Sequence, residues 1–419
     1  MQRTTTDRSG SDFYKWVILG LLTVAQLVMS IGSYAWGPMA PFLRDEFGIN
    51  RTQIGTIVSS LYFSSVIVAL PAGFAVDKHG ARPILIIALV TMGLSFVILS
   101  MVNKFSYFIV FASLSGIGYG MINQISTKGI MTWFHSKTRA TAMGIKQTGV
   151  TLGGSIGAIL LPALSFSFNW RVAMLVVGLL IITISIISFI SYKESPQNDF
   201  RDKKSSELNM YIPGWRENFI KLSSNPELRI ICFIGMLLAA AQTCIASFMV
   251  LYFNEALHYS VTVSGICLSL YMLSGTVGRI IWGVVSDRIF KGQREKPIII
   301  IGIIACMSSS LMSMLSPLSS YGMIFLISIV MGLSFMGWNA VYLTLVAEIS
   351  GPDLAGAVTG YTITVVWIGI ILGPPIFGFI SDHIGYSWGW IMLSVFGLLA
   401  SVFLAKKNPD HGTQSFLRA

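Results

Sequence analysis

Long apolar stretches alternate with short polar segments along the whole chain. A helix that crosses the roughly 30 Å hydrocarbon core of a bilayer needs about 20 apolar residues. Such stretches predict transmembrane helices at residues 16–38, 52–75, 83–102, 106–134, 140–164, 171–192, 228–252, 261–285, 297–316, 320–347, 355–379 and 387–405. A long polar segment at residues 193–227 separates the sixth from the seventh. We therefore expect an all-α membrane protein with twelve transmembrane helices in two groups of six.

The two groups of six repeat each other at nearly constant spacing. A shift of 210 residues relates one set of positions, namely Gly55, Gly73 and Asp77 to Gly265, Gly283 and Asp287. A shift of 216 relates a second set, namely Gly116, Asn123, Gly144, Gly153 and Gly157 to Gly332, Asn339, Gly360, Gly369 and Gly373. Duplicated bundles are typical of secondary transporters, which bind their solute near the bilayer midplane. We predict two pseudo-symmetric six-helix bundles at 1–192 and 228–405, a cytoplasmic linker at 193–227 and a cytoplasmic tail at 406–419.

Composition and charge narrow the class of protein further. Of 419 residues, 54% are hydrophobic and 11% are charged, which excludes a water-soluble globular enzyme and a disordered chain. With the N-terminus inside, twenty-one of the 28 Lys and Arg residues fall on the cytoplasmic side, four on the other side and three within spans. The positive-inside rule therefore places both termini in the cytoplasm. Topology explains the net charge of +10 without a nucleic-acid partner. Short outer loops suggest a bacterial inner (plasma) membrane.

Three basic residues lie within predicted spans, whereas no acidic residue is placed mid-span. A charge at the bilayer centre costs at least about 2.5–3.5 kcal/mol. Lys128 is close enough to the inner end of its helix to reach the interface. Arg279 and Lys146 lie deeper, beside glycines that mark helix-contacting faces, and their repeat positions hold Ala69 and Thr362. This asymmetry favours a solute-specific role and an anionic solute. A structural ion pair or a carbonyl clamp is the alternative for both residues.

Further polar residues complete a candidate binding pocket in the predicted cavity-lining helices. They are Tyr34 in the first span, Tyr119 and Asn123 in the fourth, Gln242 in the seventh, and Trp338 and Asn339 in the tenth. Asn123 and Asn339 are repeat mates, so a structural role is an equal alternative for them. Because no carboxylate or histidine lies mid-span to carry a proton, we expect anion exchange, facilitated movement, or symport in which the proton accompanies the solute.

Two loops carry a recognisable signature. The loop after the second span reads Gly73-Phe-Ala-Val-Asp77-Lys78-His79-Gly80-Ala81-Arg82, and its copy begins Gly283-Val-Val-Ser-Asp287-Arg288. This pattern resembles the G-x-x-x-D-[RK]-x-G-R-[RK] loop of the major facilitator superfamily, with Ala81 in place of a basic residue. The resemblance implies the major facilitator fold and transport by alternating access. It also implies a cytoplasmic gating role for Asp77, Lys78, Arg82, Asp287 and Arg288.

A narrower resemblance is to the monocarboxylate and oxalate/formate porters. The first span contains Ile31-Gly32-Ser33-Tyr34-Ala35-Trp36, which is similar to the [DE]-G-[GS]-[WF]-[GA]-W motif of those porters, with Ile31 replacing the acid. Arg279 stands where members place an arginine for the substrate carboxylate. The resemblance implies a secondary active transporter of a small organic anion, a monocarboxylate or a related acid. Arg279 would then hold the carboxylate, and Lys146 would supply a second positive charge.

Three other functions fit parts of the sequence. A multidrug exporter of the same superfamily is favoured by the Gly149-x-x-x-Gly153-Gly154-x-x-Gly157 stripe, although such exporters generally use membrane-embedded acids. A membrane enzyme would need a nucleophile with a base, or a metal cluster, within the spans, where the sequence places no histidine and no carboxylate. We therefore expect no enzyme activity, no metal and no cofactor. The third alternative is a non-transporting sensor with the same fold, which would differ from a transporter in having no net flux of solute. We expect a monomer in the lipid bilayer, with a small anionic solute and a co-transported proton or an exchanged anion as partners.

Overall fold

The computed structural model describes residues 5–194 and 225–406, with the side chains of residues 5–12, 136–137, 140 and 350–357 left aside. Within these ranges the chain is helical apart from short connections and contains no strand. Twelve helical segments are long and apolar enough to cross a membrane, which confirms the predicted number. Large apolar side chains are exposed on these helices, for example Ile186, Phe189 and Ile190. The chain is therefore an integral membrane protein, because a bilayer accommodates such surfaces and water does not.

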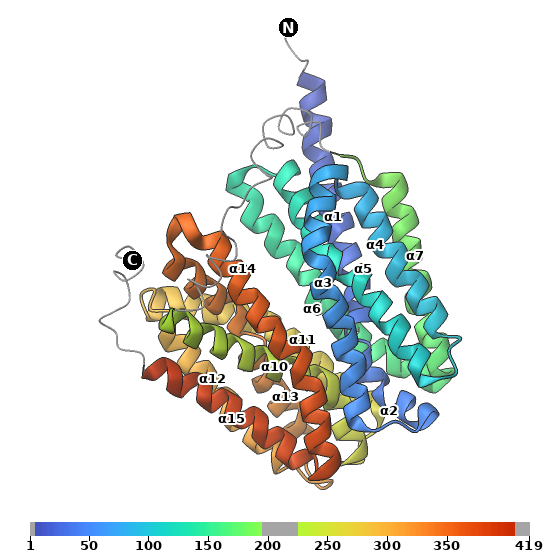
Figure 1. Cartoon of the computed structure of the whole chain (residues 1–419), viewed down its shortest axis with the longest axis vertical. Coiled ribbons are helices and arrows are strands. Elements are labelled where there is room, and N and C mark those ends of the chain that lie inside the picture. The colour runs from blue at the N-terminus through green and yellow to red at the C-terminus, as the bar shows by residue number, and fades with distance from the viewer. Residues whose placement is uncertain (1–4, 195–224, 407–419) are drawn as a thin grey trace. The chain divides into compact units, whose positions relative to one another are not determined.

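The helices form two compact units (Figure 1). The first unit comprises Met1–Ala35 and Ser60–Ile212, and the second comprises Trp36–Ser59 and Pro213–Ala419. In the first unit lie α1 (Thr5–Ser33), most of α3 (Arg51–His79), α4 (Ala81–Leu99), α5 (Phe105–Trp133), α6 (Ser136–Ser167) and α7 (Trp170–Ser191). In the second lie α2 (Trp36–Phe47), α10 (Pro226–Glu255), α11 (Val261–Val284), the π-helical turn η1 (Val285–Ile289), α12 (Glu295–Ser313), α13 (Tyr321–Phe335), α14 (Trp338–His383) and α15 (Tyr386–Ala405).

The same helix pairs pack together in both units. In the first unit, α1 packs against α6 and α4 packs against α7. Their counterparts in the second unit are α10 against α14 and α12 against α15. The duplication read from the glycine spacing is thus repeated in the packing of each unit.

Two spans are broken where the sequence predicts continuous helices. The first span ends as α1 at Ser33 and resumes as α2 at Trp36, and the tenth ends as α13 at Phe335 and resumes as α14 at Trp338. At the second break the backbone turns tightly at Gly337. A Cβ at this position would lie 2.1 Å from the Leu333 carbonyl oxygen, so the turn leaves room only for glycine. α14 then continues to His383 and joins the tenth span to the eleventh, across residues where the sequence predicts a loop.

Candidate functional site: two polar clusters in the spans

Lys146 is a buried cation in the first unit. Its side chain on α6 is 3% exposed, and its Nζ donates a hydrogen bond to Oδ1 of Asn123 on α5 at 2.8 Å. Asn123 itself is exposed. Among the described residues no carboxylate lies within ion-pair distance of Lys146. A buried ammonium with a neutral partner is costly, so an anionic ligand would be strongly favoured beside it.

The glycines that follow Lys146 on α6 explain its burial. A Cβ on Gly149 would lie 2.7 Å from the Thr23 carbonyl oxygen, and one on Gly153 would lie 2.3 Å from that of Leu27. These contacts bring α1 directly onto α6. Because Lys146 and Gly149 are one helical turn apart, the lysine shares the face that α1 covers. The predicted helix-contacting role of this stripe is confirmed.

Three tyrosines of the first unit interact with one another and with α1. Tyr119 is 8% exposed and lies one turn before Asn123, and its hydroxyl interacts with the side chains of Ser30 and Ser33 of α1. The Tyr62 ring packs edge-on against the Tyr119 ring, with 6.4 Å between the ring centres. Tyr62 in turn interacts electrostatically with Tyr34, which begins the break after α1.

Gln242 ties together the polar residues of the second unit. Its Oε1 accepts hydrogen bonds from Trp338 Nε1 at 3.1 Å and from Asn339 Nδ2 at 2.9 Å. Its backbone carbonyl accepts a hydrogen bond from the Tyr271 hydroxyl at 3.4 Å. The structure thus brings together three predicted pocket residues from two spans, the seventh and the tenth. Trp338 and Asn339 lie at the start of α14, immediately after the second helix break, and Gln242 lies on α10.

The Arg279 side chain is hydrogen-bonded to the backbone at that same break. It is half-buried on α11, and its Nε donates to the Met336 carbonyl oxygen at 3.2 Å, while Trp282 Nε1 donates to that of Leu333 at 2.9 Å. Gly275 allows this approach, since a Cβ there would lie 2.4 Å from Met336 Cβ. Carbonyls at the end of a helix lack partners within the helix. Arg279 therefore serves at least partly as the carbonyl clamp that the sequence leaves open as an alternative.

The two aspartates of the predicted gating set each form an ion pair within their own unit. Asp77 Oδ1 accepts from Lys128 Nζ at 2.8 Å, so Lys128 is an ion-pair partner as well as a residue near the helix end. Its repeat mate Asp287 pairs with Arg294, which also contacts Glu348 at 2.9 Å. The hydrogen bonds that Arg294 donates to Glu348 and Asp287 raise the pKa of its guanidinium.

The other three members of the predicted gating set differ in their surroundings. The backbone N–H of Arg82 donates to Glu194 Oε1 at 2.7 Å, and its guanidinium donates to the Phe189 carbonyl oxygen at 2.5 Å. Lys78 and Arg288 are exposed.

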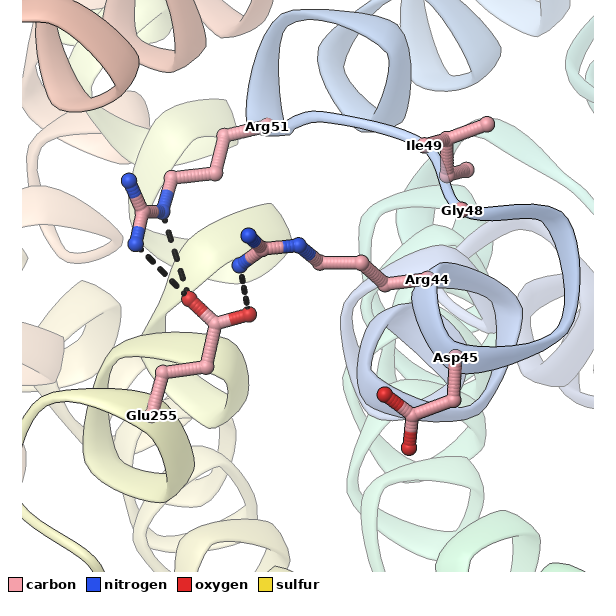
Figure 2. Close-up of a pocket in the computed structure, with 6 residues that line it drawn as sticks. All are labelled: Arg44, Asp45, Gly48, Ile49, Arg51 and Glu255. Atoms are coloured by element: carbon pink, nitrogen blue, oxygen red, sulfur yellow. Dashed lines mark hydrogen bonds and ion pairs between the residues drawn. The ribbon is translucent and has the colours of Figure 1, made fainter.

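An open pocket of about 520 Å³ in the second unit involves residues that the sequence does not identify as a site. It is lined by Arg44, Asp45, Gly48, Ile49, Arg51 and Glu255 (Figure 2). Sequence reasoning treats these charged residues only as outer-side or helix-end charges. Their proximity depends on residues more than 200 positions apart, so no local pattern reveals it.

Comparison with known proteins places the fold. The model of the Major Facilitator Superfamily matches residues 22–374 and, in a second match, 231–419. The chain belongs to the major facilitator superfamily. The superfamily predicted from the two loops is thus confirmed, and with it the fold.

Individual relatives are distant. The chain is 23% identical to the hexuronate transporter of Bacillus subtilis over 401 residues, covering 93% of this chain and 94% of that protein. It is 22% identical to a probable sulfoacetate transporter of Cupriavidus necator, covering 93% of each chain. Among solved structures, a bacterial homologue of the human lysosomal transporter Spinster superposes with a TM-score of 0.79, at 16% identity over 94% of this chain and 96% of the other.

Proposed function

We propose that this chain is a secondary active transporter of a small organic anion, such as a sugar acid or another monocarboxylate, in a bacterial inner membrane. The observation that carries the proposal is the Lys146 ammonium, 3% exposed and hydrogen-bonded to the neutral amide of Asn123. A carboxylate or sulfonate on the solute would supply the counter-charge that the described residues around it do not. The hexuronate and sulfoacetate transporters among the relatives carry anions of this kind.

The tyrosines of the first unit suit a solute with hydroxyl groups. Tyr119, Tyr62 and Tyr34 present aromatic rings with hydroxyls in the same unit. A hydroxylated acid could exchange hydrogen bonds with these groups while its carboxylate engages the lysine. Arg279 keeps its predicted role as a planar partner for a carboxylate, combined with its bond to Met336.

We further propose that the solute moves by anion exchange, facilitated movement or symport in which the proton accompanies the solute. We favour these three mechanisms over proton symport through a protein carboxylate, because the sequence places no carboxylate mid-span. Tight one-to-one proton coupling that disappears when a single loop acid is neutralised would contradict it.

Uptake by purified protein in liposomes tests the proposal. The solutes are glucuronate, galactonate, sulfoacetate, lactate, uncharged glucose and the lipophilic cation tetraphenylphosphonium, each with and without a pH gradient. We expect flux for at least one anion and none for glucose or the cation. Flux of the cation alone would identify a drug exporter instead. Absence of flux for all solutes, with anion binding retained, would identify a sensor.

A further inference from the structure

An open pocket of about 340 Å³ lies in the first unit, at the connection between the end of α4 and the start of α5. Both of these helix ends lie away from the start of α1 (Figure 1). Five of the seven residues that line the pocket are apolar or aromatic, namely Ile98, Met101, Val102, Tyr107 and Phe111. The other two are Asn103 and Lys104. The lining thus joins an apolar wall to one positive charge.

Arg171 fixes the shape of this connection. Its Nη1 donates hydrogen bonds to the Val102 carbonyl oxygen at 2.7 Å and to that of Ser100 at 3.3 Å, and its Nη2 donates to Asn103 Oδ1 at 2.8 Å. The guanidinium also lies 4.4 Å from the centre of the Trp170 ring. Arg171 is therefore engaged by the chain itself, and the pocket is formed without a ligand.

The charge of Lys104 is not neutralised by a carboxylate. Lys104 is exposed, and it takes part in no ion pair with another described residue. In the part of the first unit whose side chains are described, the carboxylates are those of Asp77 and Glu194. Asp77 pairs with Lys128, and Glu194 accepts the backbone N–H of Arg82. The pocket therefore presents a positive charge to its ligand, which favours an anionic group.

The pocket lies where two membrane-spanning helices end, so it borders both the bilayer and water. α4 and α5 are both long and apolar enough to cross a membrane, and the connection between them lies at the boundary. Around it, Met101 is 69% exposed, Tyr107 59% and Val110 58%, and a bilayer covers apolar surface of this extent with acyl chains. The connection follows the third predicted span, so the positive-inside rule places it at the outer face of the membrane.

The second unit lacks this combination at the equivalent position. The shift of 216 residues that relates the two units also relates the starts of α5 and α13, and it aligns Lys104 with Ser320. The corresponding connection, at residues 314–320, contains no charged residue. The Ser320 hydroxyl accepts the backbone N–H of Met323 at 3.3 Å, as an ordinary helix cap. The repeated fold therefore does not require a lysine here, and a ligand is a reason for its presence.

We propose that this pocket binds an anionic phospholipid of the outer leaflet. The lipid phosphate lies at Lys104, and one acyl chain lies along the apolar wall beside Met101 and Phe111. A soluble anion would use the lysine alone, whereas a phospholipid matches both parts of the pocket, and a basic side chain at the membrane surface attracts anionic headgroups. The proposal does not depend on the proposed transport function, since neither Lys146 nor Arg279 lines this pocket.

Native mass spectrometry of the full chain in a non-ionic detergent tests the proposal, because it resolves individual bound lipids. The probes are dioleoyl phosphatidylglycerol, which is anionic, and dioleoyl phosphatidylcholine, which has no net charge. Each is titrated against the unmodified chain and against Lys104→Gln, Lys104→Arg and Met101→Gln, which change exposed side chains and leave the packing intact. Lys406→Gln is the matched control, because Lys406 is another exposed lysine at the end of a span.

We expect the unmodified chain to bind its first phosphatidylglycerol about tenfold more tightly than phosphatidylcholine. Lys104→Gln should lower the affinity for phosphatidylglycerol about fivefold and leave that for phosphatidylcholine unchanged, whereas Lys104→Arg should keep both affinities. Met101→Gln should weaken both lipids about two- to threefold, because both place an acyl chain on the wall. Lys406→Gln should change neither affinity.

Unchanged affinity for phosphatidylglycerol in Lys104→Gln would overturn the proposal. An equal loss in Lys406→Gln would overturn it too, because the attraction would then come from the overall charge of the chain. Soluble glycerol phosphate, added in excess over the lipid, identifies the source of the phosphate. It should leave the lipid bound, since it has no acyl chain, and displacement of the lipid would identify a site for a soluble phosphate instead. None of these outcomes depends on whether the chain transports an anion.

Discussion

Asn123 and Asn339 occupy equivalent positions in the two repeats, yet their side chains play opposite roles. In the first unit, Asn123 accepts a hydrogen bond from a cation, Lys146. In the second, Asn339 donates a hydrogen bond to an uncharged amide, Gln242, which also accepts from Trp338. The second cluster is neutral and its groups satisfy one another, whereas the first carries a charge. We infer that the fold supplied two equivalent polar positions and that Lys146, beside the first of them, is the main partner of the solute's charge.

The strongest way to break this comparison is to remove the cation of the first cluster. Lys146→Met keeps the length and apolar stem of the side chain, and we expect uptake affinity for the anion to fall at least about 100-fold, since a desolvated anion would lose its charged partner. Uptake kinetics in liposomes measure the effect. Lys128→Met is the matched control, because Lys128 is also an intramembrane lysine but pairs with Asp77. Equal affinity losses in both variants would argue against a specific role for Lys146.

Arg279→Lys tests whether the basic residue of the second unit also contributes to anion binding. A lysine retains the positive charge but loses the planar pair of donors, and we expect about tenfold weaker anion binding, measured by calorimetry. Thermal stability should also fall in Arg279→Ala, because the Met336 carbonyl at the helix break loses a hydrogen bond. If Arg279→Lys loses stability but keeps full affinity, Arg279 is a clamp and not a binding residue.

Removing each asparagine in turn compares the twins directly. Asn123→Ala should weaken anion affinity about three- to tenfold, because Lys146 loses the hydrogen bond that orients it. Asn339→Ala should change affinity less than about threefold, since Trp338 still donates to Gln242. Binding titrations of both variants give the result. A larger loss in Asn339→Ala would reverse the assignment of roles to the two clusters.

Substitutions of the repeat mates Asp77 and Asp287 should have the smallest effects. They should change the rate of transport and leave the affinity for the anion unchanged. Asp77→Asn removes a single partly exposed ion pair, to Lys128, and we expect turnover to change by no more than about fivefold with anion affinity unchanged. Asp287→Asn leaves Arg294 paired with Glu348, so its effect should be smaller still. Transport rates at saturating solute separate the two. A loss of affinity in either variant would contradict a purely conformational role.

Local sequence patterns are enough to predict the twelve spans, the duplication and the superfamily. The spans and the duplication depend on apolar runs and on repeated glycines, and the superfamily depends on the resemblance of the two loops, all of which a single chain displays directly. The sequence also singled out Lys146, because a charge in an apolar run is conspicuous. Its hydrogen bond to Asn123 follows less directly, although both residues were placed in the same pocket.

The cluster at Glu255 and the helix breaks could not be predicted in the same way. Glu255, Asp382 and Arg51 look like ordinary helix-end charges, and their proximity is set by packing between distant segments. Tyr62 was missed because a tyrosine in an apolar span is common. The break before Trp338 depends on the tight turn at Gly337, which resembles many other glycines of this chain.

The central claim is that Lys146 recognises the charge of the solute. The most direct test is calorimetric binding of the anion with the highest flux and of its uncharged primary amide, to the unmodified chain and to Lys146→Gln. The account predicts that the unmodified chain prefers the anion by about 100-fold or more, and that Lys146→Gln keeps no more than about a tenfold preference, the share that Arg279 supplies. If Lys146→Gln keeps the full preference for the anion, another group recognises the charge and the account is wrong.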